Sequence, residues 1–116
     1  MLRILYYPDR SKGPVKDYQD KLEVERPEAH GRWMRDLEVL GVEGLHSPNI
    51  TVRPIGNGLW ELKRLYDGIQ YRLFFVVHQG AVWLLHNIEK KSKKTPKKDL
   101  RLAFKRLREL TLKCQS

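Results

Sequence analysis

The stretch IQYRLFFVVHQGAVWLLHNI, residues 69–88, constrains the fold more than any other part of this chain. Two runs rich in β-branched and aromatic residues flank the dipeptide Gln79-Gly80, a pattern that predicts a β-hairpin closed by a two-residue turn. The preceding LWELKRL and YDG supply another strand and another turn, so we expect three consecutive antiparallel strands. Because the middle strand is apolar on both sides near its centre, both faces of the sheet should be covered.

Helical patterns lie on both sides of these strands. SKGPVKDYQDKL places Pro14 at a first helical position, and Pro27 ends or restarts that helix. PEAHGRWMRDLEVLG predicts a second helix with Gly41 as its C-terminal cap. The last helix should begin with Thr95 as its cap and Pro96 at its first position.

These elements give an α+β fold. LRILYY near the start predicts a first strand, and we interpret residues 41–58 as loop with one short extended piece. The order β-α-α-β-β-β-α indicates an antiparallel sheet with an N-terminal helical hairpin and a C-terminal helix. A chain of 116 residues supports one hydrophobic core, so we expect a single domain over residues 1–116.

Positive charge is concentrated at one end of the chain. The net charge is +9, and residues 86–116 hold eleven Lys and Arg against three Asp and Glu. Such an uneven excess is typical of nucleic-acid binders, although a solvated loop and a basic helix face would give the same count.

Other features bear on location and cofactors. No apolar window of about 18 residues predicts a membrane span, and the start does not look like a signal peptide. The single cysteine, Cys114, allows no internal disulfide, and the usual metal-ligand spacings are absent. We therefore expect a cytoplasmic protein without a metal or another cofactor.

Three motifs in a fixed order resemble a known family. GLWEL (residues 58–62), YRLFF (71–75) and LLHNIEKKSKKTP (84–96), followed by a helix with Ala103, are similar to the RelE/ParE superfamily of type II toxin-antitoxin toxins, most closely its HigB-like, phage-derived branch. The resemblance implies a RelE-like fold and metal-independent cleavage of mRNA on translating ribosomes. It also implies neutralisation by a helix-turn-helix antitoxin. A ParE-like inhibitor of DNA gyrase and an inactive, basic nucleic-acid-binding prophage remnant remain alternatives.

Metal-free RNA cleavage needs a base for the ribose 2′-hydroxyl, cations for the charge that develops on phosphate, and an acid for the leaving oxygen. Arg72 is the first candidate, because a charge in an otherwise apolar strand is either a paired core arginine or a cation presented to phosphate. The family places an important arginine there. Lys91 is the second candidate, and Lys63 stands where the family commonly has arginine.

His86 is the remaining catalytic candidate, since histidine titrates near neutral pH. Strand alternation puts it on the side of Leu84 and Ile88, which favours a half-buried histidine with a satisfied partner. Contacts to the RNA or ribosomal backbone are expected from a further set of basic residues: Arg64, Lys90, Lys93, Lys94, Lys97 and Lys98.

The sequence departs from the family pattern at the acid and the base. Several RelE-like nucleases have a tyrosine or an acidic residue near the C-terminus, whereas residues 97–116 contain no tyrosine and only Asp99 and Glu109 as acids. Glu61 lies two residues before Lys63, where the best-studied branch supplies lysine. The acid–base pair of those relatives therefore cannot be transferred to this chain.

Overall fold

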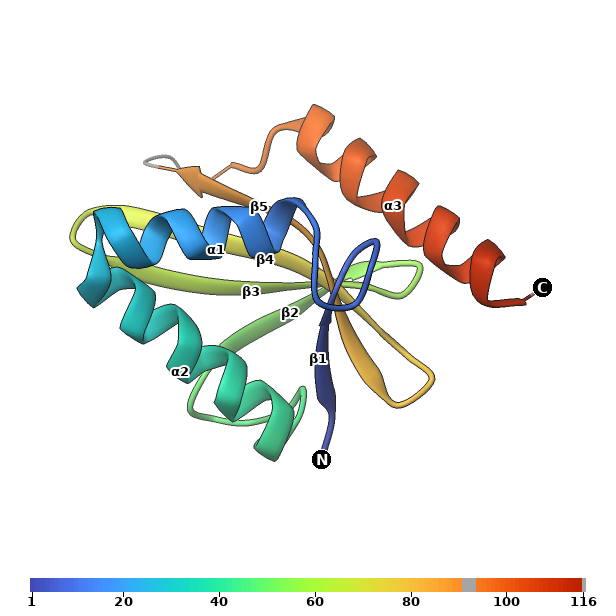
Figure 1. Ribbon diagram of the computed structural model, residues 1–116, viewed down its shortest axis with the longest axis horizontal. Helices are drawn as coiled ribbons and strands as arrows, with labels where there is room; N and C mark the ends of the chain where they lie inside the picture. Colours follow the sequence, from blue (N-terminus) through green and yellow to red (C-terminus); the bar gives the residue numbers. More distant parts are fainter. Residues whose placement is uncertain (91–93, 116) are drawn as a thin grey trace.

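The fold is a five-stranded sheet between two layers of helices, seen in a computed structural model that describes residues 1–90 and 94–115 (Figure 1). The elements in chain order are β1 (Arg3–Tyr6), α1 (Pro14–Glu25), α2 (Pro27–Glu43), β2 (Thr51–Gly56), β3 (Leu59–Tyr66), β4 (Ile69–His78), β5 (Ala81–Lys90) and α3 (Lys97–Gln115). The strand order is β1-β5-β4-β3-β2. β1 pairs with β5 in parallel, and the other neighbouring strands are antiparallel.

The predicted α+β class and its order of elements are confirmed. Strands β2 to β5 are joined by turns at residues 57–58, 67–68 and 79–80, which read Asn-Gly, Asp-Gly and Gln-Gly. Both residues of each turn have positive φ, the backbone of a type I′ hairpin turn. The short extended piece expected within residues 41–58 is β2. Pro54 fits there because β2 is an edge strand.

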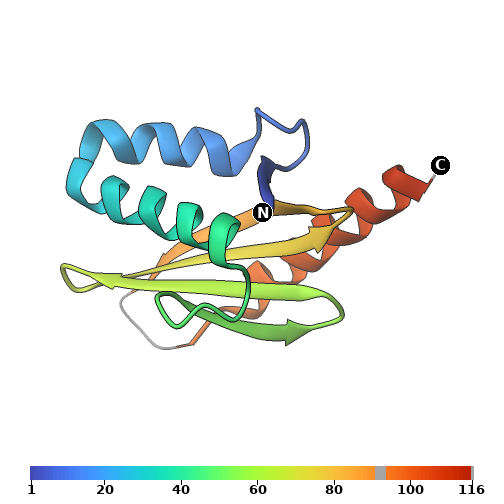
Figure 2. The ribbon, with the colours of Figure 1, turned by 90° about the horizontal axis from the view of Figure 1, so that it is seen from below.

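Helices cover both faces of the sheet, as the apolar centre of β4 predicts. Figure 2 shows the hairpin of α1 and α2 on one side and α3 on the other. Leu73 and Phe75 of β4 pack in the core under the helical hairpin, whereas Phe74 and Val76 pack in the core under α3. Over the described part of the chain, no helix combines the length and the apolar character needed to cross a membrane.

A β-bulge in β5 changes which side chains face α3. The pairing of β4 with β5 steps from Phe74–His86 to Phe75–Leu84, so Leu85 is an extra residue. Leu84 packs in the core under the helical hairpin, whereas Leu85 packs in the core under α3. His86 also lies on the α3 side, with its ring stacked on Phe74 at 6.2 Å between centroids. The expectation that His86 shares a side with Leu84 is therefore wrong, because simple alternation does not include the inserted residue.

Two predicted helix caps differ from the structure. α2 continues through Gly41, and Gly44 takes the cap position with φ of 86°. Gly41 instead packs closely against β1, since a Cβ there would lie 3.0 Å from the carbonyl oxygen of Leu2, which is a tight contact. At the other end of the chain, α3 begins at Lys97, and the Thr95 hydroxyl donates a hydrogen bond to a side chain of the sheet.

Glu89 ties the helical hairpin to the sheet. Arg26, between α1 and α2, donates a hydrogen bond from Nη2 to the Glu89 carboxylate at 2.5 Å, and the Tyr18 hydroxyl donates to the same oxygen. Burial alone would raise the pKa of Glu89. The hydrogen bonds from Arg26 and Tyr18 outweigh that effect, so the pKa lies below its ordinary value of 4.5.

This tie predicts acid-dependent stability. A carboxylate whose pKa is lowered by folding stabilises the protein above its unfolded pKa, and that contribution is lost as the pH falls through the folded pKa. The substitution Glu89→Gln should therefore lower the free energy of unfolding at pH 6 to 7, and the difference from the wild-type protein should shrink below pH 4.5. Urea unfolding at several pH values measures it. Glu25→Gln, on exposed α1 surface, is the control, and a pH-independent difference for Glu89→Gln would contradict the role of the tie.

Candidate functional site

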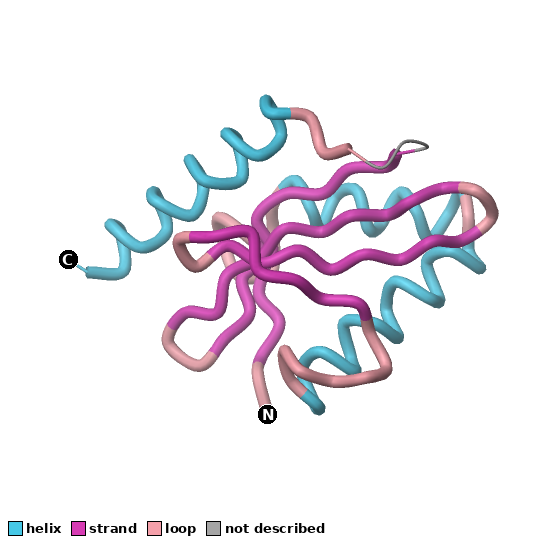
Figure 3. Tube along the Cα trace, turned by 180° about the vertical axis from the view of Figure 1, so that it is seen from behind, coloured by secondary structure: helices cyan, strands magenta, loops and turns pink. Residues whose placement is uncertain are grey.

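Figure 3 shows that α3 lies over one end of the sheet, while the strands continue past the start of this helix. Several polar residues of the strands lie on this same face of the sheet, beside the core under α3. The register places Lys63 of β3 beside Arg72 of β4, and Gln70 of β4 beside Lys90 of β5. Because side chains alternate along a strand, Lys63, Arg72 and Lys90 share this face with Glu61. Three separate strands thus bring basic residues together on one rigid surface, which we call the basic face.

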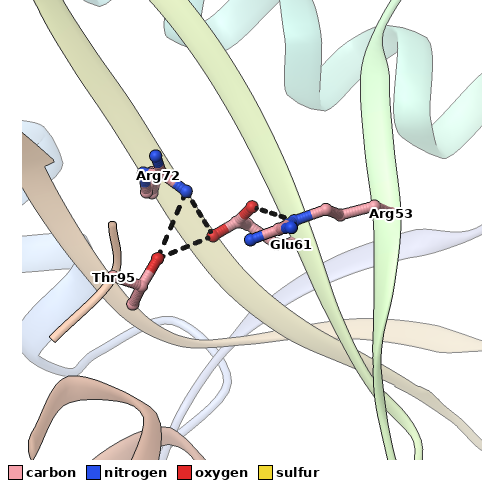
Figure 4. Close-up of polar contacts among 4 residues, drawn as sticks. All are labelled: Arg53, Glu61, Arg72 and Thr95. Carbon is pink, nitrogen blue, oxygen red and sulfur yellow. Dashed lines mark hydrogen bonds and ion pairs between the residues drawn. The ribbon is translucent and has the colours of Figure 1, made fainter. Parts of the chain in front are cut away.

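At the centre of the basic face, one buried carboxylate is held by two guanidinium groups (Figure 4). Arg72 donates a hydrogen bond from Nη1 to Oε2 of Glu61 at 3.2 Å, and Arg53 donates from Nε to Oε1 at 2.7 Å. The Thr95 hydroxyl donates to the same Oε2 at 3.3 Å and accepts from Arg72 at 3.2 Å. The carboxylate of Glu61 is fully buried, so it depends on these donors for the hydrogen bonds that it has lost from water.

Arg72 therefore matches the first of its two expected alternatives, a paired core arginine. Its side chain is only 2% exposed and bonds to Glu61. The expected presentation of this guanidinium to a phosphate is not what the structure shows. The Thr95 side chain, which we expected to cap α3, lies against the pair instead. Arg72 thus links β4 to β3 and to the segment that leads into α3.

The other expected cations differ in their positions. Lys63 and Lys90 are half-buried on the basic face, while Lys94, Lys97 and Lys98 are exposed in the segment that enters α3 and in its first turn. Lys91 and Lys93 lie outside the described residues. Lys94 immediately precedes Thr95, whose hydroxyl bonds to Arg72 and Glu61.

Arg64, which we expected among the RNA-binding residues, lies on the opposite face of the sheet from Lys63, and its contact with RNA stays a prediction. It follows Lys63 directly, and neighbouring strand residues point to opposite sides. Its guanidinium forms a bidentate pair with the buried Asp36 of α2, with 2.8 Å between Nε and Oδ2. The hydrogen bonds to Asp36 raise the pKa of Arg64 further above its usual range. Arg64 therefore holds the helical hairpin onto the sheet.

His86 is half-buried and has a partner, as we expected. Its Nε2 lies 2.8 Å from Oδ1 of Asp99 in the first turn of α3, so the contact joins β5 to the start of that helix. Its role in catalysis stays a prediction. Among the side chains that the structure describes, no group of three or more His, Cys, Asp or Glu gathers in a way that could hold a metal ion.

Sequence reasoning missed Arg53 and the structural role of Glu61. Arg53 comes from β2, in a segment interpreted mostly as loop, so nothing indicated which way its side chain points. The pairing of Arg53 with Glu61 across β2 and β3 supplies that information. Among the strand residues that the structure describes, the basic face then includes four basic residues and one acidic residue: Arg53, Lys63, Arg72 and Lys90, with Glu61. Such an imbalance attracts polyanions.

The buried pair predicts non-additive effects on stability. Glu61→Leu removes the carboxylate that holds Arg72 and should lower the free energy of unfolding by about 3 to 5 kcal/mol. Adding Arg72→Met replaces the second charge with an apolar side chain and should recover most of that loss. Urea unfolding of the two single variants and the double variant measures the coupling. A double variant that is no more stable than Glu61→Leu would contradict a mainly structural role for Arg72.

Comparison with known proteins identifies the family. Residues 18–108, which run from within α1 to within α3 and include the whole described basic face, match the family described as "Phage derived protein Gp49-like (DUF891)". A search of the curated proteins and a search of the solved structures return no match. The match covers well over half of the chain, so the protein belongs to the Gp49-like family of phage-derived proteins, a family of RelE/ParE-like toxins.

Proposed function

We propose that this protein is the toxin of a type II toxin-antitoxin system and cleaves mRNA on translating ribosomes in the cytoplasm. The finer placement within the HigB-like branch is part of the proposal. The observation that carries it is the basic face, where strand register gathers cations from β2, β3, β4 and β5 on one side of a rigid sheet. A helix-turn-helix antitoxin would neutralise the toxin.

The basic face suits a transcript because phosphates are recognised by cations held in fixed positions. Lys63 and Lys90 lie on that face, and the exposed lysines 94, 97 and 98 extend the positive charge toward α3. In the proposed reaction the ribose 2′-hydroxyl attacks the adjacent phosphate. A base takes the proton of the attacking oxygen, and the phosphorus–oxygen bond to the next nucleotide breaks. An acid protonates the leaving 5′-oxygen, and a 2′,3′-cyclic phosphate remains on the first nucleotide. Lys63 stabilises the negative charge on the phosphate oxygens.

Arg72 has a positioning role in this proposal. Its charge is offset by Glu61, and both groups are buried. Through its hydrogen bond to Thr95, Arg72 holds the segment that leads into α3 against the sheet. The arginine that the family resemblance singles out therefore acts by holding the site together, and the phosphate is contacted by the more exposed cations.

A variant at Lys63 tests the proposal directly. The protein is expressed briefly in bacteria, and the 5′ ends of mRNA are mapped for the wild-type protein and for Lys63→Met. The wild-type protein should produce new cuts in register with codons, and the variant should reduce them by about 10²-fold, as expected when one charge-stabilising donor is lost. Lys21→Met is the matched control, because Lys21 is 70% exposed on α1, away from the basic face.

Other outcomes of the same experiment favour different functions. Growth arrest with intact mRNA and an induced DNA-damage response would indicate a ParE-like inhibitor of gyrase. Absence of any effect on growth would indicate an inactive nucleic-acid-binding remnant. Equal cutting by the wild-type protein and Lys63→Met would support the nuclease activity and show that Lys63 does not contribute to it. Co-expression of a helix-turn-helix protein encoded beside the toxin should abolish the cuts.

A further inference from the structure

We infer that Arg53 is a phosphate-binding residue of the basic face, with its guanidinium held by Glu61 in the orientation that receives a phosphodiester group. The choice of single-stranded RNA as the natural source of that phosphodiester rests on the proposed function. The phosphate site itself follows from the geometry of four side chains (Figure 4).

The position of Arg53 on β2 puts it beside the other cations. Arg53 is the cross-strand partner of Glu61, and Thr51, two residues earlier, is the partner of Lys63. Its side chain reaches the carboxylate of Glu61, which places it on the α3 side of the sheet. β2 is an edge strand, so a ligand can approach Arg53 from outside the sheet as well as from above it.

The two arginines that bond to Glu61 differ in how far their side chains are exposed to solvent. The side chain of Arg53 is 51% exposed, whereas that of Arg72 is 2% exposed. Glu61 thus pairs with one guanidinium group that is buried and with one that is half exposed to solvent. Of these two arginines, Arg53 is the one that a ligand can reach.

The hydrogen bond from Nε to Glu61 orients Arg53 without using the end of its guanidinium group. Its Nε donates to Oε1 of Glu61 at 2.7 Å, and Oε2 of the same carboxylate is occupied by Arg72 and Thr95. Within the described part of the chain, the two terminal nitrogens of Arg53 are thus left for a ligand. A guanidinium presents these donors as a planar fork that matches two oxygens of a phosphate. Fixing the fork in advance reduces the entropy lost on binding.

Binding of a non-cleavable RNA tests this site without any need for catalysis. A single-stranded RNA with 2′-O-methyl groups lacks the nucleophile, so its affinity can be measured at several salt concentrations by fluorescence anisotropy. Arg53→Gln should weaken binding roughly tenfold or more, as expected for a lost charge-assisted contact. The slope of log affinity against log salt should fall in magnitude by about 0.7, the value for one phosphate contact to a single strand.

Two further variants separate the phosphate site from general charge and from stability. Arg53→Lys keeps the charge and loses the fork, so it should keep most of the salt slope while binding more weakly than the wild-type protein. Arg35→Gln removes an exposed charge from α2 on the other side of the sheet and should bind as the wild-type protein does. Thermal unfolding of each variant shows whether the assay was done on folded protein.

The inference is overturned if folded Arg53→Gln binds with the affinity and salt slope of Arg35→Gln. It is also overturned if Arg53→Lys binds as the wild-type protein does, because the fork would then contribute nothing. A protein that cuts no mRNA in cells but shows Arg53-dependent binding would contradict the proposed nuclease and support the phosphate site. If the Arg53→Gln variant cuts mRNA and binds RNA as well as the wild-type protein does, the result would support the proposed nuclease and contradict the phosphate site at Arg53.

Discussion

The buried carboxylate of Glu61 is the interaction on which this side of the molecule depends. An isolated carboxylate inside a protein is very unfavourable, and here two guanidinium groups and a hydroxyl compensate for the lost water. Those partners come from β2, from β4 and from the segment before α3. One acidic group therefore fixes the edge strand, the centre of the sheet and the approach to the last helix in a single arrangement.

A corresponding pair fixes the other side of the sheet. Asp36 of α2 is almost fully buried and is held by Arg64, the residue next to Lys63. Each face of β3 thus contributes to a carboxylate–guanidinium pair, with the acid on the strand in one case and on the helix in the other. The two neighbouring basic residues of the motif ELKR consequently differ in their contacts. Arg64 anchors the helical hairpin, and Lys63 lies on the basic face.

Much of the fold was readable from the sequence because its signals are local. Turn dipeptides, prolines at helix starts and apolar runs each act over a few residues, and they correctly gave the β3–β4 and β4–β5 hairpins and the three helices. The β2–β3 hairpin was not predicted, because its first strand was interpreted only as a short extended piece within a loop. The caps at Gly41 and Thr95 were wrong because tertiary contacts decided them. The candidate site was harder. Arg72 is buried because its diagonal neighbour on β3 is Glu61, which pairs with it. The register that brings these two residues together cannot be predicted from composition or periodicity.

The β-bulge at Leu85 determines on which face of the sheet the charged residues at the end of β5 lie. Beyond that point Ile88 and Lys90 face the same way as Arg72, while Glu89 reaches the opposite layer and joins Arg26. If the same residues were paired without the bulge, with Leu85 in a regular position opposite Phe74, the side chains beyond it would exchange sides. Glu89 would then lie on the basic face, and Lys90 would lie on the face of the helical hairpin, where Arg26 is. The β-bulge thus places the acidic and the basic side chains at this end of β5 on opposite faces of the sheet.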